Sequence, residues 1–407
     1  MRVALFAETF LPKTDGVATT TCHLLEHLSR RGHQALVFAP EGAPERYAGM
    51  PVVGISGFRF PLYPELRLAS PLVSLDNRLA AFRPDVVHLI NPALLGLVGL
   101  RQARRMNVPV VASYHTDIPG YAEQYYGLGA LSNPLWGYFR WIHNQADVNF
   151  CPSRFTQAQL RDHGFQRVKV WPHGVDTARF NPRRYRYEWR VRLCGGAAQA
   201  SQPLLLYVGR LAAEKRVEWL CPLIEALPGV RLAIVGDGPM RRALEDMFSG
   251  TPTVFTGFLR GDDLACAYAS ADLFVFPSSS ETFGNVILEA MASGLPVIAP
   301  RAGGPVDHVI DGYNGFLFSP NDPEEMIALT RSLVWAPEHA RQIGDNARAH
   351  ALSQSWEEIL DALLDEYRAL VQRYRSNRYP TGLRMPFGAQ SPQQESVAER
   401  ARPPTTA

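Results

Sequence analysis

The sequence predicts an α/β protein made of two doubly wound parallel-sheet domains. Short apolar runs alternate with helical stretches up to about residue 180, and the alternation starts again after residue 202. Such alternation is typical of βαβ units, whose strands pair in parallel. A length of 407 residues, against a usual domain size of about 150, also indicates two large domains.

Domain one is expected at residues 1–180, with a helix near 19–31 and strands in RVALFAETF, QALVFAP, PDVVHLI, PVVASYH and ADVNFCPS. Domain two is expected at 203–355, with strands in LLLYVG, RLAIVGDG, TVFTG, DLFVFP and PVIAP. Residues 181–202 end in a Gly/Ala/Ser/Gln stretch without a periodic apolar face, which predicts a linker. Residues 356–375 form an amphipathic helix, and residues 376–407, rich in Pro, Gln, Ser and Arg, predict a disordered tail.

Composition excludes several classes of protein. A hydrophobic fraction of 46% with 20% charged residues excludes disordered, collagen-like and coiled-coil chains. The longest apolar run, 86–100, is interrupted by His88 and Asn91 and is shorter than the ~20 residues of a membrane span. The first ten residues carry Glu8 and no cleavage site, so we expect a buried strand and a cytoplasmic protein. Five dispersed cysteines without C-x-x-C predict reduced core thiols.

Charge differs between the two halves. Residues 1–180 hold 18 Lys and Arg against 13 Asp and Glu, although the whole chain has a net charge of only +2. This surplus suits a first domain that meets an anionic surface or substrate, and chance is the equal alternative.

Residues after the first strand of domain two predict a phosphate site. Gly209 ends the strand, and Arg210 and Lys215 follow in the loop before the next helix. Two cations at the carboxyl end of a strand can neutralise a diphosphate leaving group. Solvated surface charge is the alternative interpretation.

The segment after the strand DLFVFP predicts the rest of a donor site. Glu281 and Glu289 lie eight residues apart around a helix start, where the N–H groups of Phe283, Gly284 and Asn285 would face a phosphate. Glu289 lies in an apolar helix, where burial without a partner is costly, so a ribose hydroxyl is a sensible ligand. Alternatively, Glu281 only caps the helix and Glu289 is solvated.

Weaker signals complete the predicted cleft. Asp237 and Gly238 form a tight turn in VGDGP that lets backbone approach a base or ribose, although such turns are common. In domain one, Gly16 precedes a helix, and His115 and Asp117 follow a strand. A satisfied core histidine is the alternative for His115. The sequence contains no Asp-x-Asp, G-x-S-x-G or P-loop motif, so we expect no metal, serine hydrolase or P-loop chemistry.

The segments GRLAAEK, VGDGP and ETFGNVILEAMASGLPVIA resemble retaining glycosyltransferase family 4. The resemblance implies the GT-B architecture of two facing Rossmann-like domains, with a C-terminal crossover helix that returns toward domain one. FAETFLPKTDGV, GISGFRFPLYPELRLASP, HLINPALLGL and SYHTDIPGY are similar to bacterial sulfolipid synthases. GDP-mannose-dependent mannosyltransferases share the opening and SYHTD-like segments, and Phe283 and Asn285 are closer to their pattern.

The resemblance also implies roles and partners. Arg210 and Lys215 would hold the diphosphate, Glu289 the ribose, and Glu281 with the backbone of residues 283–285 the sugar and phosphate, while Gly16 and His115 close the cleft. The implied reaction moves sulfoquinovose from UDP-sulfoquinovose to diacylglycerol with retention, and GDP-mannose is the alternative donor. No cofactor, metal or nucleic acid is implied. A GT-B nucleotide-sugar epimerase and a non-catalytic binding protein are the readings from other classes, and intact Lys215 and Glu289 disfavour the second.

A lipid acceptor requires access to a membrane surface. FRFPLYPELRL and YYGLGALSNPLWGYFRW combine basic and aromatic residues, with Trp136, Tyr138, Phe139, Arg140 and Trp141 in the second. Such side chains can lie at a membrane interface, so we expect peripheral association with the inner face of the cytoplasmic membrane. An aromatic-rich core helix is the alternative.

Overall fold

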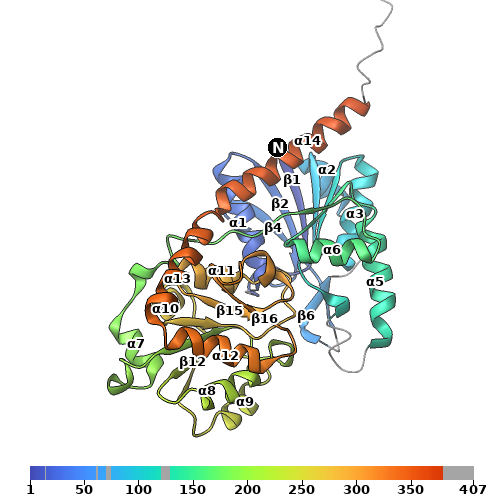
Figure 1. Ribbon diagram of the computed structural model, residues 1–407. Coiled ribbons are helices and arrows are strands. Elements are labelled where there is room, and N and C mark those ends of the chain that lie inside the picture. The colour runs from blue at the N-terminus through green and yellow to red at the C-terminus, as the bar shows by residue number, and fades with distance from the viewer. Residues whose placement is uncertain (14, 61–62, 70–74, 121–128, 379–407) are drawn as a thin grey trace, which may run out of the picture.

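The computed structural model describes residues 1–13, 15–60, 63–69, 75–120 and 129–378. It contains two α/β domains, each with a mainly or wholly parallel sheet and helices on both faces (Figure 1). The predicted fold class is therefore confirmed.

Domain one contains an eight-stranded sheet in the order β10-β9-β8-β7-β1-β2-β4-β3. Every neighbouring pair is parallel except β3 with β4. The strands are β1 (Arg2–Ala7), β2 (Gln34–Pro40), β3 (Arg46–Tyr47), β4 (Met50–Ile55), β7 (Val86–Ile90), β8 (Val110–Ser113), β9 (Val148–Cys151) and β10 (Val168–Val170). A separate antiparallel pair consists of β5 (Gly57–Phe60) and β6 (Tyr63–Ala69). The helices are α1 (Gly16–Arg30), α2 (Asp76–Phe82), α3 (Leu94–Met106), α5 (Gly129–His143) and α6 (Arg154–Asp162).

Burial on both faces explains the unbroken apolar runs of this sheet. Successive side chains of a strand point to opposite faces. In β1, Val3 and Leu5 enter one core with α1, while Ala4 and Phe6 enter a second core with α3. Both faces of the strand therefore demand apolar residues.

Domain two has a six-stranded parallel sheet in the order β13-β12-β11-β14-β15-β16 around one apolar core. The strands are β11 (Leu204–Val208), β12 (Arg231–Val235), β13 (Thr253–Gly257), β14 (Leu273–Val275), β15 (Val297–Pro300) and β16 (Gly315–Phe318). The α-helices are α8 (Leu220–Glu225), α9 (Arg241–Met247), α10 (Gly261–Ala269), α11 (Asn285–Ala292), α12 (Pro323–Val334) and α13 (Pro337–Leu352). Short 3₁₀ turns are η3 (Ala213–Lys215), η4 (Val217–Trp219) and η5 (Gly304–Asp307).

The segment 181–202, expected as a linker, is instead a packed part of domain two. It contains η1 (Pro182–Arg184), α7 (Tyr187–Cys194) and η2 (Ala197–Gln199). Leu193 and Cys194 are fully buried in the core of that domain, and the Arg190 guanidinium donates to the carbonyl of Ser270 at 2.8 Å. The Gly/Ala/Ser/Gln stretch hid this helix because its apolar contacts come from a single turn.

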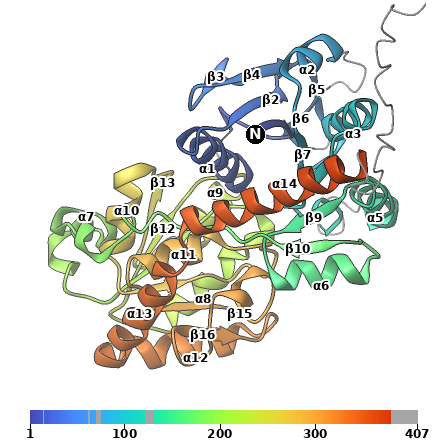
Figure 2. The ribbon, with the colours of Figure 1, turned by 90° about the horizontal axis from the view of Figure 1, so that it is seen from above.

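The last helix returns to domain one. Helix α14 (Trp356–Arg378) crosses from domain two and lies along domain one (Figures 1 and 2). Its apolar face joins the α1-side core through Leu360, Leu363, Leu364, Tyr367, Leu370 and Val371. The helix extends past the expected end at residue 375, and residues 379–407 of the expected tail lie outside the described part of the chain.

Where the chain crosses between domains, its two passages touch. The N–H of Val175 donates to the carbonyl of Gln354 at 3.1 Å. A Cβ at Gly174 would lie 2.6 Å from the backbone nitrogen of Trp356, so only glycine fits there.

All five cysteines are free thiols, four of them buried. Across the described ranges, no helix is both long and apolar enough to cross a membrane.

Candidate active site

The strand order places one switch point in each sheet. In domain one, β1 lies between β2 and β7, and in domain two, β11 lies between β12 and β14. In each sheet the strands that follow the central strand are added first on one side of it and then on the other, so the strand order reverses there. Ligands of doubly wound sheets bind beyond the carboxyl ends of the strands at this point. The segments after β1, β8, β11, β12 and β14 supply the predicted site residues, and most of the cross-domain contacts described below involve these segments.

The predicted loop after β11 is held by the VGDGP turn. The N–H of Gly209 donates to the Val235 carbonyl, and that of Leu211 donates to the Asp237 carbonyl, each at 3.0 Å. A Cβ at Gly236 would lie 1.9 Å from the Gly209 carbonyl oxygen, and one at Gly238 would lie 2.4 Å from the Leu211 carbonyl oxygen. These glycines therefore serve close backbone packing that fixes the Arg210 loop.

The two predicted phosphate cations are already paired with carboxylates. The Arg210 guanidinium lies 3.2 Å from Oε1 of Glu214, whose side chain is only 3% exposed. Lys215 forms an ion pair with Glu281, which follows β14. The Ser280 hydroxyl lies 3.4 Å from the Glu214 carbonyl and ties the two loops together. The structure thus brings Lys215 and Glu281 together, and Glu214 is a partner that sequence reasoning missed.

Helix α11 begins at Asn285, which lies within the predicted helix start. Gly284 precedes it with φ 92°, a left-handed conformation that favours glycine. Within the described ranges, no carbonyl accepts a hydrogen bond from the N–H of Phe283, Gly284 or Asn285. Phe283 is 2% exposed and its ring packs against that of His173 from domain one. The three N–H groups can therefore meet an anion beside the domain interface.

Glu289 has a partner inside the protein. The Tyr268 hydroxyl from α10 donates to its Oε2 at 2.9 Å, while Oε1 receives no hydrogen bond from any residue that the structure describes. Burial raises the pKa of Glu289 to about 7, and the hydrogen bond from Tyr268 acts in the opposite direction. Glu289 is partly exposed, and its Oε1 can accept a hydrogen bond from a ligand.

Two further glycines shape the loop between β14 and α11. The Gly304 N–H donates to the Glu281 carbonyl at 2.7 Å. A Cβ at Gly303 would lie 2.5 Å from that carbonyl oxygen, and one at Gly304 would lie 2.2 Å from the Phe283 carbonyl oxygen. Sequence reasoning missed this pair, and the signal that could have found it is the Gly-Gly dipeptide separated from the end of β15 by two residues.

Domain one meets this loop through residues near Gly16 and His115. A Cβ at Gly16, the first residue of α1, would lie 2.9 Å from Nδ2 of Asn285. The Thr282 hydroxyl donates to the His115 carbonyl at 2.8 Å. Both contacts cross between the domains and place Gly16 and His115 at the predicted cleft. Thr282 is a further residue at this contact that the sequence did not predict.

The ring of His115, which was predicted to be catalytic, is buried. It is 6% exposed, and its nitrogens lie 2.9 Å from Ser113 Oγ and 3.3 Å from His173 Nε2. Burial, followed by the nearby His173, holds the pKa of His115 well below its ordinary value. The ring is therefore neutral at neutral pH, and both of its nitrogens have partners within domain one.

A cavity of about 290 Å³ opens beside Glu281. Its walls come from both domains and include Trp136, Gln159 and Ser280. Asp117 also lines it and accepts hydrogen bonds from the Tyr114 hydroxyl at 2.9 Å and from Gln159 Nε2 at 3.1 Å. A polar group on a second substrate could reach Glu281 through this cavity. Asp237, by contrast, is exposed and accepts from the N–H of Gly238 in its own turn.

Glu8 occupies the start of another helix. Its Oε1 accepts from the N–H groups of Ala93 and Gly96 at 2.7 and 2.8 Å, so a protein carboxylate fills the N-terminal end of α3. Burial raises the pKa of Glu8 to about 7, and these hydrogen bonds act in the opposite direction. A bound anion is therefore not expected at α3.

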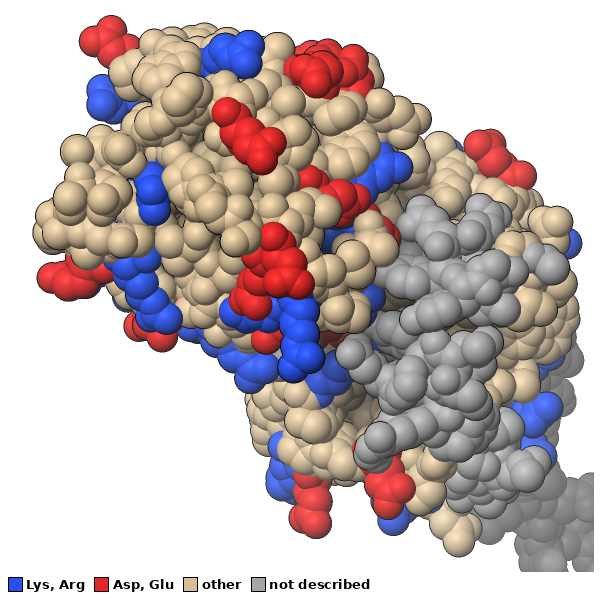
Figure 3. All heavy atoms as spheres, turned by 90° about the horizontal axis from the view of Figure 1, so that it is seen from below, with Lys and Arg blue, Asp and Glu red and all other residues tan. Residues whose placement is uncertain are grey.

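Charge is mixed around the outside of the cleft. Lys and Arg side chains lie among Asp and Glu side chains on the face in Figure 3, several of them near the junction of the domains. In the part of the chain that the structure describes, no three His, Cys, Asp or Glu side chains are placed to hold a metal ion.

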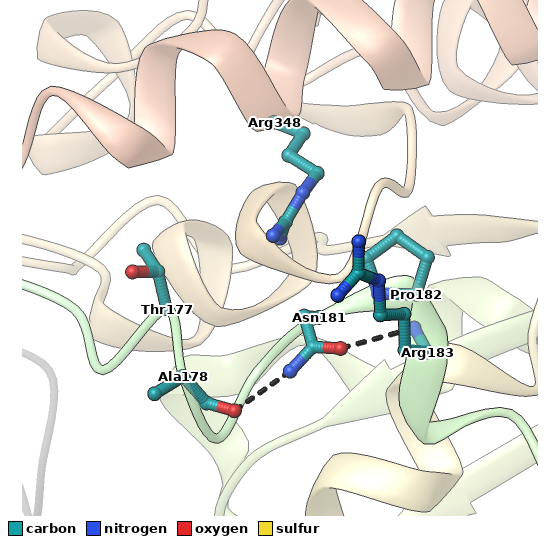
Figure 4. Close-up of a pocket in the computed structure, with 6 residues that line it drawn as sticks. All are labelled: Thr177, Ala178, Asn181, Pro182, Arg183 and Arg348. Atoms are coloured by element: carbon teal, nitrogen blue, oxygen red, sulfur yellow. Dashed lines mark hydrogen bonds between the residues drawn. The ribbon is translucent and has the colours of Figure 1, made fainter.

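A larger cavity of about 480 Å³ lies where the chain crosses between domains. Thr177, Asn181, Arg183 and Arg348 line it, and both guanidinium groups point toward it (Figure 4). Arg348 donates to the carbonyl of Ala292 at the end of α11, so it caps that helix. None of the predicted site residues lines this cavity.

Comparison with known proteins agrees with this geometry. Residues 14–179 match the Glycosyltransferase Family 4 model, and residues 202–334 match the Glycosyl transferases group 1 model. Sulfoquinovosyl transferase SQD2 of Arabidopsis thaliana is 37% identical over 387 residues, which cover 93% of this chain and 75% of the relative. A GDP-mannose-dependent alpha-mannosyltransferase of Mycobacterium tuberculosis is 42% identical over 380 residues, 92% of this chain and 98% of the relative.

Solved structures share the fold. Sucrose-phosphate synthase of Thermosynechococcus elongatus superimposes with a TM-score of 0.77 at 22% identity, over 91% of this chain and 99% of the other. Anabaena HepE in complex with UDP gives a TM-score of 0.75 at 20% identity, over 91% and 100% of the chains. Taken with the sequence matches, the two facing sheets and the loops between them show that this chain belongs to glycosyltransferase family 4.

Proposed function

We propose that this protein transfers a hexose from a nucleoside diphosphate donor to a lipid acceptor, with retention of anomeric configuration and without a metal ion. The observation that carries the proposal is the group at the start of α11. Three backbone N–H groups and the ion pair of Lys215 with Glu281 lie on adjacent loops at the carboxyl end of one sheet, and Glu289 lies in the helix α11 that follows.

Each part of this group suits one part of a donor. The helix start and Lys215 stabilise the negative charge that develops on a leaving diphosphate. Glu289 offers Oε1 to ribose hydroxyls, with Oε2 oriented by Tyr268. Lys215 supplies positive charge without a metal. Because Glu281 is paired with Lys215, we assign it to sugar binding beside the leaving group rather than to proton transfer.

The first-choice reaction is transfer of sulfoquinovose from UDP-sulfoquinovose to diacylglycerol. The segments of domain one that resemble sulfolipid synthases and the likeness to SQD2 support it. The second candidate is α-mannosyl transfer from GDP-mannose, which Phe283, Asn285 and the 42% identical relative favour. A lipid acceptor is supported by the 29% identical alpha-monoglucosyldiacylglycerol synthase of Streptococcus pneumoniae, which is named for a glycolipid product and whose match covers 74% of this chain and 71% of the relative.

Donor competition tests the reaction. The full chain is incubated with vesicles that contain diacylglycerol, separately with UDP-sulfoquinovose, UDP-glucose and GDP-mannose, and lipid products are weighed by mass spectrometry. A sulfonated glycolipid supports the first candidate, and a mannosyl lipid supports the second. Sugar release or interconversion without a lipid product contradicts glycosyl transfer to lipid and favours the epimerase alternative.

We propose that the protein reaches its acceptor as a peripheral protein at the inner face of the cytoplasmic membrane. The described part of the aromatic segment, helix α5, has both buried and exposed side chains. Trp136 and Phe139 are buried, whereas Arg140 is exposed and Trp141 is 47% exposed. Residues 61–62 and 125–128 of the two proposed membrane segments lie outside the described residues, and the side chains of 58–60 and 63–68 are not described. Trp141 on α5 can therefore lie at an interface beside a basic side chain.

Vesicle sedimentation tests this attachment. Trp141→Ala should lower the bound fraction on anionic vesicles by several-fold. Trp335→Ala removes an indole from domain two that is 59% exposed, somewhat more than Trp141, and should leave binding unchanged. Equal binding of both variants and the unmodified protein would contradict the assignment of α5 as the membrane-facing helix.

A further inference from the structure

A continuous row of hydrogen-bonded side chains joins the last helix to the donor loop. We call its six members the relay: Tyr367, His88, Ser113, His115, His173 and Asn285. Tyr367 Oη lies 2.6 Å from His88 Nδ1, and His88 Nε2 lies 3.0 Å from Ser113 Oγ. Ser113 Oγ lies 2.9 Å from His115 Nε2, and His115 Nδ1 lies 3.3 Å from His173 Nε2. His173 Nδ1 lies 2.9 Å from Asn285 Oδ1.

The relay crosses the whole of domain one. It starts in α14, passes through β7 and the end of β8, and reaches the segment after β10. Its last step, from His173 to Asn285, joins domain one to the first residue of α11 in domain two. A single row of contacts therefore connects the crossover helix with the proposed donor site.

The three imidazoles are enclosed by aromatic side chains. The Trp171 ring centre lies 5.8 Å from that of His88, 5.5 Å from that of His115 and 6.5 Å from that of His173. Burial lowers the pKa of His88 to about 3 and that of His173 to about 4. The pKa of His115 is also far below its ordinary value because of burial. Each ring is thus neutral at pH 7 and carries one N–H.

Neutral rings give the relay a direction, because each has one donor and one acceptor nitrogen. If His88 donated to Tyr367, the phenol proton would need another acceptor. Tyr367 is fully buried, and among the described residues its hydroxyl has no hydrogen bond other than the one with His88. A buried donor without a partner is costly. Tyr367 therefore donates to His88, and each later member donates to the next.

The direction determines how the Asn285 amide is turned. His173 donates from Nδ1, so Oδ1 of Asn285 faces His173 and its NH₂ group faces the other way. Nδ2 lies 2.9 Å from the position of a Cβ at Gly16, the first residue of α1 in domain one. The amide oxygen of Asn285 thus faces His173 and its nitrogen faces Gly16, both in domain one. A reversed amide would instead present its oxygen to Gly16.

We propose that Tyr367, His88 and Ser113 are positioning residues that act through His115 and His173 to hold Asn285 in one orientation when the domains are closed. This inference rests on the proposed function, since it takes the start of α11 as the donor site. Through the relay, helix α14 stabilises the arrangement in which the N–H groups of α11 face the donor phosphate from a closed cleft.

The direction is tested by ¹⁵N NMR of the full chain with labelled histidine, with ring signals assigned by single His→Gln variants. We expect the Nε2-protonated tautomer at His88 and the Nδ1-protonated tautomer at His115 and His173, all neutral at pH 7. The opposite tautomer or a charged ring at any of the three would overturn the relay. This result does not depend on which donor is used.

Kinetics test the positioning role. Tyr367→Phe removes one hydroxyl and should raise the donor KM about tenfold, the size of one buried hydrogen bond, with less than twofold change in acceptor KM. Tyr374→Phe is the matched control on the same helix, because Tyr374 Oη bonds Asp147 at 2.9 Å outside the relay, and it should leave both KM values unchanged.

Ser113→Ala breaks the relay at its centre and should reproduce the Tyr367→Phe result, which guards against a variant that fails to fold. Equal donor KM for Tyr367→Phe and Tyr374→Phe, or a change confined to the amount of folded protein, would overturn the proposal. If the unmodified protein transfers no sugar, the proposed function fails, and the tautomer pattern alone then decides the relay.

Discussion

Replacing Lys215 by alanine is the strongest test of the proposed phosphate site. Its ammonium group forms an ion pair with Glu281, and the two side chains are only 12% and 22% exposed. A cation in such a partly desolvated site, aimed at a developing charge, contributes about 2.7–4 kcal/mol to the transition state. Lys215→Ala should therefore lower kcat by roughly 100-fold or more.

The same substitution should also cost stability. Glu281 would keep its place between two loops without its cation, which costs about 1–3 kcal/mol of unfolding free energy for a partly buried group. Initial rates at several donor concentrations, measured well below the unfolding temperature, separate this loss from the loss of turnover.

Lys169→Ala is the matched control for Lys215→Ala. Lys169 also forms an ion pair, with Glu366 at 2.6 Å, but its side chain is 54% exposed. An exposed pair contributes at most about 1 kcal/mol, so turnover should be unchanged. Unchanged kcat in Lys215→Ala, or an equal fall in Lys169→Ala, would refute the phosphate role.

Three further predictions concern the same loops. Tyr268→Phe removes the hydrogen bond that orients Glu289, so the donor KM should rise about fivefold with little change in kcat, as steady-state rates would show. Donor affinity should fall as the pH drops below about 7, because the buried carboxyl of Glu289 becomes protonated, and calorimetric titration of Glu289→Gln should show that this dependence is lost. Stability should change with pH in the opposite direction to donor affinity. The pKa of Glu289 is higher in the folded state than the unfolded value of 4.5, so its contribution to the free energy of unfolding is complete below pH 4.5 and is lost as the pH rises through about 7. Gly304→Ala places a Cβ 2.2 Å from the Phe283 carbonyl oxygen and should cost about 1–3 kcal/mol in urea unfolding, whereas Gly137→Ala, with no atom within 4 Å, should be neutral or stabilising.

Local pattern was sufficient to predict most of the fold. Strands buried on both faces must be apolar throughout, so β1, β2, β11 and β12 stand out in the sequence. Helix α7 was missed because its buried residues are Arg190, Leu193 and Cys194, and two apolar side chains are too few for a periodic signal. The neighbouring strands β3 and β4 and the antiparallel pair β5–β6 were missed as well. β3 has only two residues, and β4 mixes buried and exposed residues instead of forming an unbroken apolar run.

The candidate site was predicted in kind but not in its pairings. Charged and glycine residues after strand ends marked Arg210, Lys215, Glu281 and Glu289, because the carboxyl ends of parallel strands share one edge. Glu214 lies only four residues after Arg210 in the same loop, but spacing alone does not show that the two side chains meet. The Lys215–Glu281 ion pair and the Tyr268–Glu289 hydrogen bond join separate segments, and sequence spacing does not encode such contacts. Whether these residues bind a donor stays a prediction that the experiments above test.

By itself, the sequence determined the alternation of strands and helices, the two-domain division and the residue types at the strand ends, because these depend on local periodicity and on the chemistry of single side chains. Only the tertiary structure decided what each polar group meets. The relay brings together residues 279 positions apart, Tyr367 and His88, and it ends on Asn285 in the other domain. Burial among aromatic rings then sets their protonation, which is a property of the packed environment and not of any one residue.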